Sequence, residues 1–213
     1  MVQGIEKEES MTTKDTFDAC KWAALSHPDV LWASYTAARH VLELGVLGDF
    51  VECGVFAGAQ CAMMARALID AGETNRRVHL FDSFEGVPTP SEQDGGMIED
   101  KMRSQTRCGI DDVKAYMAEW GIPSGLLVYH HGLYSGTIPP AGGRFDIAFL
   151  RIDCDLYESV SLVLQKLYPW VSDRGVTMMD DYHFPGARLA FQECLNPYEL
   201  GQIMWWRRER SAK

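Results

Sequence analysis

The sequence predicts an α/β protein with a doubly wound, mostly parallel sheet. Short apolar runs alternate with helical stretches along most of the chain, which is typical of βαβ units. Two of these runs end in aspartate pairs, Asp153 with Asp155 and Asp180 with Asp181. Because open α/β sheets place their ligand sites at the carboxyl ends of strands, we expect the four carboxylates to meet at one site.

The first half of the chain predicts two helices, two strands and a third helix. Residues 1–16 are polar and should lack regular structure, whereas apolar residues at three and four spacing predict helices that break at His27-Pro28. Ala, Met and Leu favour the third helix. In order, we expect two helices within 18–44, the second over 29–44, a strand over 50–53, a helix over 59–71 and a strand over 78–81.

The second half continues the alternation after a loop over 82–96 that is rich in proline and glycine. An aspartate at the start of the next helix is expected to be its N-cap. In order, we expect a helix over 110–120, strands over 126–129 and 147–152, a helix over 159–170, a strand over 176–179, a helix over 187–194 and an edge strand over 203–206.

The composition predicts one ordinary globular domain. The chain has 213 residues, of which 46% are hydrophobic and 23% charged. Its formal net charge of −10 argues against nucleic acid as a partner. We expect no membrane span, because no apolar run approaches about 18 residues. Six cysteines without CxxC spacing, together with a charged N-terminus that does not resemble a signal peptide, predict a cytoplasmic protein with reduced thiols.

The first strand, turn and helix read GDFVECGVFAGAQ, with Glu52 near the strand end and Gly54 and Gly58 in the turn. The GxxxG spacing does not fit the GxGxxG cradle of a pyrophosphate, so the turn is either structural or a loop that approaches a ligand. Asp82 ends the next strand 24 residues after Gly58 (82 − 58 = 24), where nucleoside-binding folds place a ribose acceptor. Alternatively, Asp82 caps the turn that follows it. A nucleoside site without polyphosphate contacts favours S-adenosylmethionine.

The aspartate pairs predict a cation site. Carboxylates that meet at a strand end repel one another unless a cation or protons offset their charge, and oxygen ligands suit a hard divalent ion such as Mg²⁺. The alternative is that each pair caps a strand-to-helix turn. His130, His131 and His183 are secondary candidates for a general base, with His183 the best placed, although such histidines more often pack or hydrogen-bond to the backbone.

Five stretches together resemble one known family. They are GDFVECGVFAGA, HLFDSFEGVP, HHGLYSGTIP, FLRIDCDLYES and MMDDYHFPGARLAF, in family order from residue 48 to residue 191. The chain resembles the macrocin O-methyltransferase family, which comprises metal-dependent enzymes that methylate sugar hydroxyls on natural products. One departure lies in the glycine turn, where the family's usual arginine is absent from Phe56-Ala57-Gly58-Ala59.

The resemblance implies a class I methyltransferase fold with seven strands, the last of them antiparallel. It implies one domain over 1–213, with an N-terminal helical lid segment over 1–47 and an α/β core over 48–213. The implied contacts of S-adenosylmethionine are Tyr35, Glu52, Gly54, Gly58, Asp82, Ser83 and Gly132. Of these, Tyr35 has a simple alternative role in helix packing. The implied metal ligands are Asp153, Asp180 and Asp181, and the implied general base is Asp155. His183 stays the second catalytic candidate from its position beside the aspartate pair.

The expected function is therefore Mg²⁺-dependent transfer of a methyl group from S-adenosylmethionine to a hydroxyl, on a sugar of a small natural product. A homodimer or a higher homo-oligomer stays open. Two other classes also stay open, a DxD metal-dependent glycosyltransferase and a non-catalytic protein that binds a cofactor or a metal. A phosphatase with a DxD nucleophile fits less well, since its DxD lies on the first strand.

Overall fold

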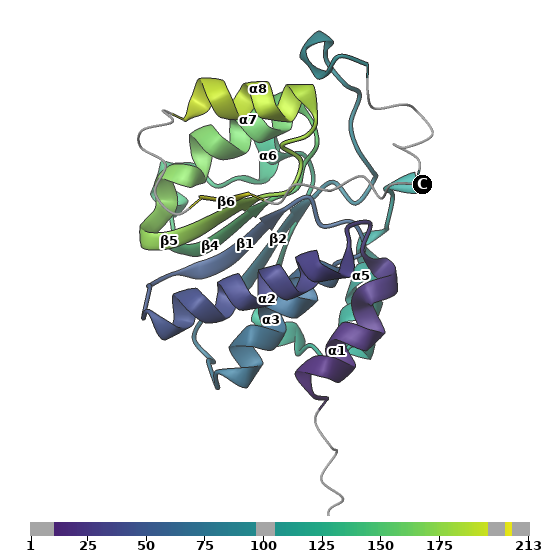
Figure 1. Cartoon of the computed structure of the whole chain (residues 1–213), viewed down its shortest axis with the longest axis vertical. Coiled ribbons are helices and arrows are strands. Elements are labelled where there is room, and N and C mark those ends of the chain that lie inside the picture. Colours follow the sequence, from purple (N-terminus) through teal and green to yellow (C-terminus); the bar gives the residue numbers. More distant parts are fainter. Residues whose placement is uncertain (1–10, 97–104, 196–202, 206–213) are drawn as a thin grey trace, which may run out of the picture.

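The computed structural model describes residues 11–96, 105–195 and 203–205, and its centre is a parallel sheet (Figure 1). The described residues form six strands in the order β3-β2-β1-β4-β5-β6, and every pairing between them is parallel. The strands are β1 Asp49–Cys53, β2 Val78–Asp82, β3 Leu127–His131, β4 Ile147–Ile152, β5 Val171–Met179 and β6 Ile203–Trp205.

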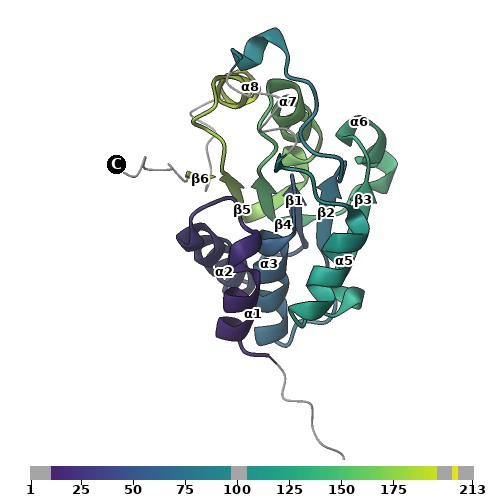
Figure 2. The ribbon, with the colours of Figure 1, turned by 90° about the vertical axis from the view of Figure 1, so that its right-hand side faces the viewer.

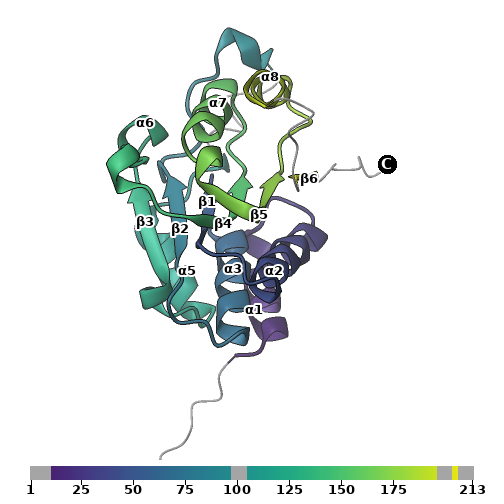
Figure 3. The same cartoon turned by 90° about the vertical axis from the view of Figure 1, so that its left-hand side faces the viewer.

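Helices cover both faces of the sheet (Figures 1 and 2). One face carries α1 Thr13–Cys20, α2 Pro28–Glu43, α3 Ala59–Asp70 and α5 Ile110–Glu119. The other carries α6 Tyr134–Thr137, α7 Tyr157–Lys166 and α8 Pro185–Cys194, as Figure 3 shows from the opposite side. Short 3₁₀ turns lie at Lys21–Ala23, Glu92–Asp94, Ser124–Leu126, Ala141–Gly143 and Tyr168–Trp170.

The hydrophobic core consists of two layers, one on each side of the sheet. Phe50 and Phe149 point toward α2 and α3, whereas Val51, Leu150 and Ile152 pack toward α7 and α8. Because side chains alternate along a strand and both faces are covered, the central strands read as almost continuous apolar runs. Charged side chains inside these runs are therefore exceptional.

The strand order reverses between β1 and β4, which lie next to each other at the centre of the sheet. At such a switch point the loops after the two strands lead to helices on opposite faces, and a crevice opens between them. Here the loop after β1 leads to α3 and the loop after β4 leads to α7. The fold thus brings the glycine turn and the first aspartate pair to the same edge.

The sheet confirms the predicted α/β class with a mostly parallel sheet, but the prediction of seven strands with an antiparallel last strand is wrong. The described residues contain six strands, and β6 pairs with β5 in parallel. The reason is connectivity: α8 lies between β5 and β6, and a helical crossover returns the chain parallel to the strand it left. Trp206, the last residue of the predicted edge strand, lies outside the described residues.

Several element boundaries and one helix cap also differ from prediction. The first helix begins at Thr13, because Thr12 and Asp15 form a reciprocal capping box. Gly109 rather than an aspartate is the N-cap of α5. Strand β5 begins at Val171, five residues before the predicted start at Val176. In the part of the chain that the structure describes, no helix has both the length and the apolar character needed to cross a membrane.

Candidate functional site

A pocket lies over the carboxyl ends of β1, β2, β4 and β5. Its walls come from the connection between α1 and α2, the turns after these strands, and the start of α6. All but two of the twelve predicted site residues line it: Glu52, Gly54, Asp82, Ser83, Gly132, Asp153, Asp155, Asp180, Asp181 and His183. Tyr35 and Gly58 do not belong to its described walls.

Gly54 is the point where the turns after β1 and β4 cross. Its φ of +89° is in the left-handed region, and a Cβ there would lie 1.7 Å from the backbone oxygen of Asp153. The amide of Asp153 in turn donates to the carbonyl of Cys53 at 2.8 Å. The sequence requires glycine here because the backbones touch, and this contact sets the distance between the glycine turn and the aspartates.

Gly58 serves helix packing. It is the N-cap of α3 with φ +90°, and a Cβ would lie 2.5 Å from Cε of Met117 in α5. The GxxxG turn therefore contains one glycine that a backbone crossing needs and one that a helix contact needs, and only Gly54 lines the pocket.

Asp82 holds two turns together. Its Oδ2 accepts hydrogen bonds from the amides of Val55 at 2.6 Å and Phe56 at 3.2 Å, and its Oδ1 accepts from the amide of Phe84 at 2.6 Å. The turn-capping alternative thus describes what Asp82 does in this structure. A carboxylate oxygen has a second lone pair, so the carboxyl can also accept from a ligand hydroxyl.

Ser83 and Gly132 lie beside Asp82 on the pocket wall. The Ser83 hydroxyl donates to the carbonyl of Gly86 at 3.1 Å. The amide of Gly132 donates to the carbonyl of Asp82 at 2.9 Å, which joins the loop after β3 to the loop after β2. Gly132 has φ +137° and therefore occupies a conformation that disfavours other residues.

Tyr35 lies away from the pocket, as the packing alternative predicts. Its hydroxyl donates to Oδ2 of Asp70 at 2.9 Å, at the C-terminal end of α3, and its ring packs edge-on against Trp32. The glycine turn meets the opposite, N-terminal end of α3. The helix spacing correctly placed Tyr35 on α2 but did not show which way along the sheet it faces.

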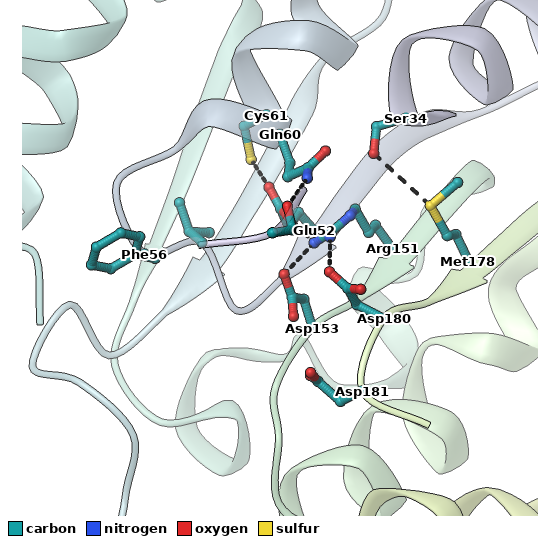
Figure 4. A network of polar contacts seen from close by, with 12 residues as sticks. Ser34, Glu52, Phe56, Gln60, Cys61, Arg151, Asp153, Met178, Asp180 and Asp181 are labelled. Carbon is teal, nitrogen blue, oxygen red and sulfur yellow. Dashed lines mark hydrogen bonds and ion pairs between the residues drawn. The ribbon is translucent and has the colours of Figure 1, made fainter. Parts of the chain in front are cut away.

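Arg151 occupies the centre of the acidic cluster (Figure 4). Its Nη1 donates to Oε1 of Glu52 at 2.7 Å and to Oδ2 of Asp153 at 2.5 Å, and its Nη2 donates to Oδ2 of Asp180 at 2.5 Å. Figure 4 shows Asp181 outside this ring of contacts. The Oδ2 of Asp181 instead accepts the amide hydrogen of Asp155 at 3.1 Å.

Arg151 is not among the predicted site residues, although one sequence signal points to it. Glu52 and Arg151 are lone charges of opposite sign within apolar strands, in FVEC and AFLRI. Such charges are rarely buried unless they pair with each other. The strand register places the two residues directly side by side.

The cluster keeps an excess of negative charge despite Arg151. Burial raises the pKa of Glu52 to about 7, against the opposing effect of Arg151. Burial, followed by the charges of Asp153 and Asp180, raises the pKa of Asp155 to about 8. Burial and the charge of Asp155 raise the pKa of Asp181 as well. One guanidinium thus offsets only part of the repulsion among these carboxyl groups, and the raised pKa values mean that protons offset part of the rest.

The predicted metal ligands suit a hard cation by chemistry and charge but not by their arrangement. Carboxylate oxygens are the donors that Mg²⁺ prefers, and the uncompensated charge would favour a cation. Within residues 11–96, 105–195 and 203–205, however, no group of three His, Cys, Asp or Glu side chains is arranged to hold a metal ion. Asp153 and Asp180 are turned toward Arg151 instead.

The three histidines fall into two groups. His183 lines the pocket and packs against the ring of Phe184. The ring of His130 stacks on Phe81, and its Nε2 lies 2.9 Å from Nδ1 of His79. Burial lowers the pKa of His130 to about 4, so this histidine serves packing. His131 packs edge-on against Phe84.

The connection between α1 and α2 forms another wall of the pocket. Leu25, Ser26 and His27 line the pocket, and the Ser26 hydroxyl accepts a hydrogen bond from Nε2 of Gln60 at 3.0 Å. This bond attaches the N-terminal segment to the first turn of α3, next to the glycine turn.

Comparisons with known proteins identify the family to which this chain is similar. Residues 31–204 match the family model of macrocin O-methyltransferase (TylF). The chain is 34% identical over 166 residues to 8-demethyl-8-(2,3-dimethoxy-alpha-L-rhamnosyl)-tetracenomycin-C 4'-O-methyltransferase of Streptomyces olivaceus; the match covers 75% of this chain and 62% of that protein. It is also 34% identical over 185 residues to demethyldecarbamoylnovobiocin O-methyltransferase of Streptomyces niveus, over 80% of this chain and 70% of that protein.

Solved structures of two methyltransferases also superpose on this chain. The O-methyltransferase NovP superposes with a TM-score of 0.71 at 28% identity, over 80% of this chain and 72% of that chain. The calicheamicin methyltransferase CalS11 superposes with a TM-score of 0.64 at 21% identity, over 87% of this chain and 78% of that chain, and this likeness concerns the fold alone.

Proposed function

The chain belongs to the macrocin O-methyltransferase family, and from this premise we propose that it transfers a methyl group from S-adenosylmethionine to a hydroxyl of a glycosylated natural product. The observation that carries the proposal is the pocket itself. It joins a glycine turn, a strand-end aspartate and a cluster of carboxylates at the switch point of a parallel sheet.

The turns after β1, β2 and β3 form the proposed donor side of the pocket. Glu52 and Gly54 would face the methionine part, Asp82 and Ser83 the ribose, and Gly132 the adenine. Hydrogen bonds through Asp82 and Gly132 tie these three turns together and so fix the shape of the wall. The donor's sulfonium methyl is an electrophile that needs no further activation by the protein.

Asp153, Asp180 and Asp181 would hold the proposed divalent cation, Mg²⁺ or a similar ion. When bound, such an ion acts as a Lewis acid toward a coordinated hydroxyl and lowers its pKa. The support is that these carboxyl groups meet at one pocket, where burial and the neighbouring carboxylates raise the pKa of Asp181. To share one ion, these carboxyl groups would present oxygens other than the Oδ2 atoms that bind Arg151 and the Asp155 amide.

Asp155 is the proposed general base. It lines the pocket two residues after Asp153, and its raised pKa makes its carboxylate a better proton acceptor than an ordinary aspartate. Its φ of +57° is unusual for a residue other than glycine, which shows that the loop holds it in a demanding conformation. His183, on the same wall, is the second candidate to accept the proton.

A sugar attached to a larger apolar group is the proposed acceptor. The Streptomyces olivaceus relative is named for a rhamnosyl-tetracenomycin, and a third relative, 29% identical over 180 residues, is the mycinamicin III 3''-O-methyltransferase of Micromonospora griseorubida. In this chain Leu25 and Leu133 line the pocket and are more than half exposed, at 56% and 60%. They would contact the apolar part of the acceptor outside the site.

We also propose that residues 1–213 form one cytoplasmic methyltransferase domain, in which the segment over 1–47 serves as a lid and 48–213 as the α/β core. Support for the lid comes from Leu25, Ser26 and His27 on the pocket wall. The proposed partner is a small hydroxylated substrate, and a homodimer or higher homo-oligomer is compatible with the family.

The direct experiment is a methyl-transfer assay that follows the mass of glycosylated acceptors, with Mg²⁺ and with excess chelator. We expect turnover with Mg²⁺ and its loss in chelator. Asp155→Asn should lose roughly 100-fold or more in turnover while it still binds the donor. Asp111→Asn, an exposed aspartate on α5, is the control and should behave as the parent chain. Undiminished turnover in chelator would remove the metal role, and normal turnover of Asp155→Asn would place the base elsewhere.

A further inference from the structure

Arg151 has an environment that a stabilising residue alone does not need. Its side chain is completely buried within β4, whose other residues are apolar. Burial of a guanidinium costs free energy that an apolar residue of similar size would not, and replacement of a buried ion-pair network by apolar residues is often neutral or stabilising. The position of Arg151 therefore calls for an explanation in terms of what its partners do.

Its three partners come from three adjacent strands. Glu52 is its neighbour on β1, Asp153 follows β4, and Asp180 follows β5. The planar guanidinium presents several N–H groups in fixed directions, and here Nη1 and Nη2 are divided among the three carboxylates. Each partner contributes one oxygen, namely Oε1 of Glu52, Oδ2 of Asp153 and Oδ2 of Asp180.

The remaining contacts hold this arrangement in place. Oε2 of Glu52 accepts from Sγ of Cys61 at 2.6 Å, so the first turn of α3 fixes that carboxylate from the other side. The arginine lies between Glu52 and Met178 in the sheet register, so a residue of each adjacent strand flanks it. Cys61, Glu52 and Arg151 therefore form a buried chain that ends at two aspartates on the pocket wall.

We propose that Arg151 is a positioning residue, which sets the spacing and orientation of Asp153 and Asp180 across the site. The inference rests on the proposed function for what these aspartates do. Without the guanidinium, the carboxylates repel one another and Glu52 is left as a buried, unpaired charge. A lysine at 151 keeps the charge but offers a single nitrogen, which cannot hold side chains from three strands in fixed directions.

The first test measures thermal unfolding in chelator and needs no turnover. Arg151→Met should lower the melting temperature by about 10 °C, because it leaves a buried charge unpaired. Addition of Glu52→Gln should recover at least half of that loss, since it removes the unpaired charge. Arg66→Met is the matched control: Arg66 is also buried and bonded to a carboxylate, Asp70, but lies at the far end of α3. There, Glu52→Gln should recover nothing. If Glu52→Gln changed the melting temperature equally in the Arg151→Met and Arg66→Met variants, the inferred pairing of Glu52 with Arg151 would be overturned.

The second test separates positioning from folding. Arg151→Lys should melt near the parent chain, lose roughly 10- to 100-fold in kcat, and keep the KM for S-adenosylmethionine within about threefold, as is typical when an orienting neighbour is lost. Parental kcat in Arg151→Lys would overturn the proposal. If the parent chain itself transfers no methyl group, the proposed function fails, and the melting experiment still decides whether Arg151 organises the carboxylates.

Discussion

At the scale of single residues, one backbone contact determines the shape of the site. Gly54 lies against the carbonyl of Asp153, and hydrogen bonds join the amide of Asp153 to Cys53 and the amide of Gly54 to Phe81. The turn that would face the methyl donor and the strand end that carries the first aspartate are thus in direct backbone contact. A change of about 1 Å at this point would alter the distance between donor and acceptor, to which group transfer is very sensitive.

Gly54→Ala should therefore destabilise the chain more than its backbone conformation alone explains. Alanine with positive φ costs about 1–2 kcal/mol, and the clash with Asp153 should raise the total to about 3 kcal/mol or more. Denaturant unfolding measures this loss. Gly72→Ala is the control, because Gly72 has φ +66° and a Cβ added there would meet no atom within 4 Å. Equal losses in the two variants would show that the crossing is not tight.

At the scale of elements, one aspartate connects a loop to two helices that follow site residues. Asp94 is 3% exposed; its Oδ2 accepts from the amide and hydroxyl of Ser91, both at 2.7 Å, and its Oδ1 accepts from the amide of Tyr157 at 2.7 Å. Tyr157 begins α7, and a Cβ on Gly186 in the first turn of α8 would lie 2.0 Å from the same Oδ1. Asp94 thus anchors the loop after β2 to the starts of α7 and α8.

Asp94→Ala should free the loop that carries Val87 and Pro88 on the pocket wall. We expect faster hydrogen exchange over 83–96 and at the start of α7, and a loss of about 1–2 kcal/mol in stability, because a buried helix cap is removed. Asp111→Ala, which removes an exposed aspartate from the first turn of α5, serves as the control. Unchanged exchange over 83–96 would mean that other contacts hold the loop.

At the scale of the whole molecule, the sequence predicts the sheet and its active edge for a definite physical reason. Apolar runs of strand length that alternate with helices predict a parallel sheet. Parallel strands have all their carboxyl ends on one side of the sheet. This arrangement of strand ends brings Asp153 and Asp155 to the same pocket as Asp180 and Asp181. The family resemblance, which the match over residues 31–204 confirms, predicts the sugar acceptor and agrees with the S-adenosylmethionine donor that the nucleoside pattern favours.

The predictions that failed, or that sequence analysis could not make, depend on register and on helix rotation. The pairing of Arg151 with Glu52 requires the register of β1 against β4, which no local pattern reveals. The direction of Tyr35 and the contact of Gly58 with Met117 depend on how whole helices pack. The direction of the last strand depends on whether a helix or a hairpin precedes it, and α8 precedes it here.

The pocket over β1, β2, β4 and β5 should bind a sulfonium nucleoside, and calorimetry tests this expectation most directly. Titration with S-adenosylmethionine and with S-adenosylhomocysteine should show binding at one site per chain. Titration with a nucleoside diphosphate sugar and Mg²⁺ should show no binding. Binding of the nucleotide sugar, with no heat from either sulfur nucleoside, would contradict the claim and favour a glycosyltransferase.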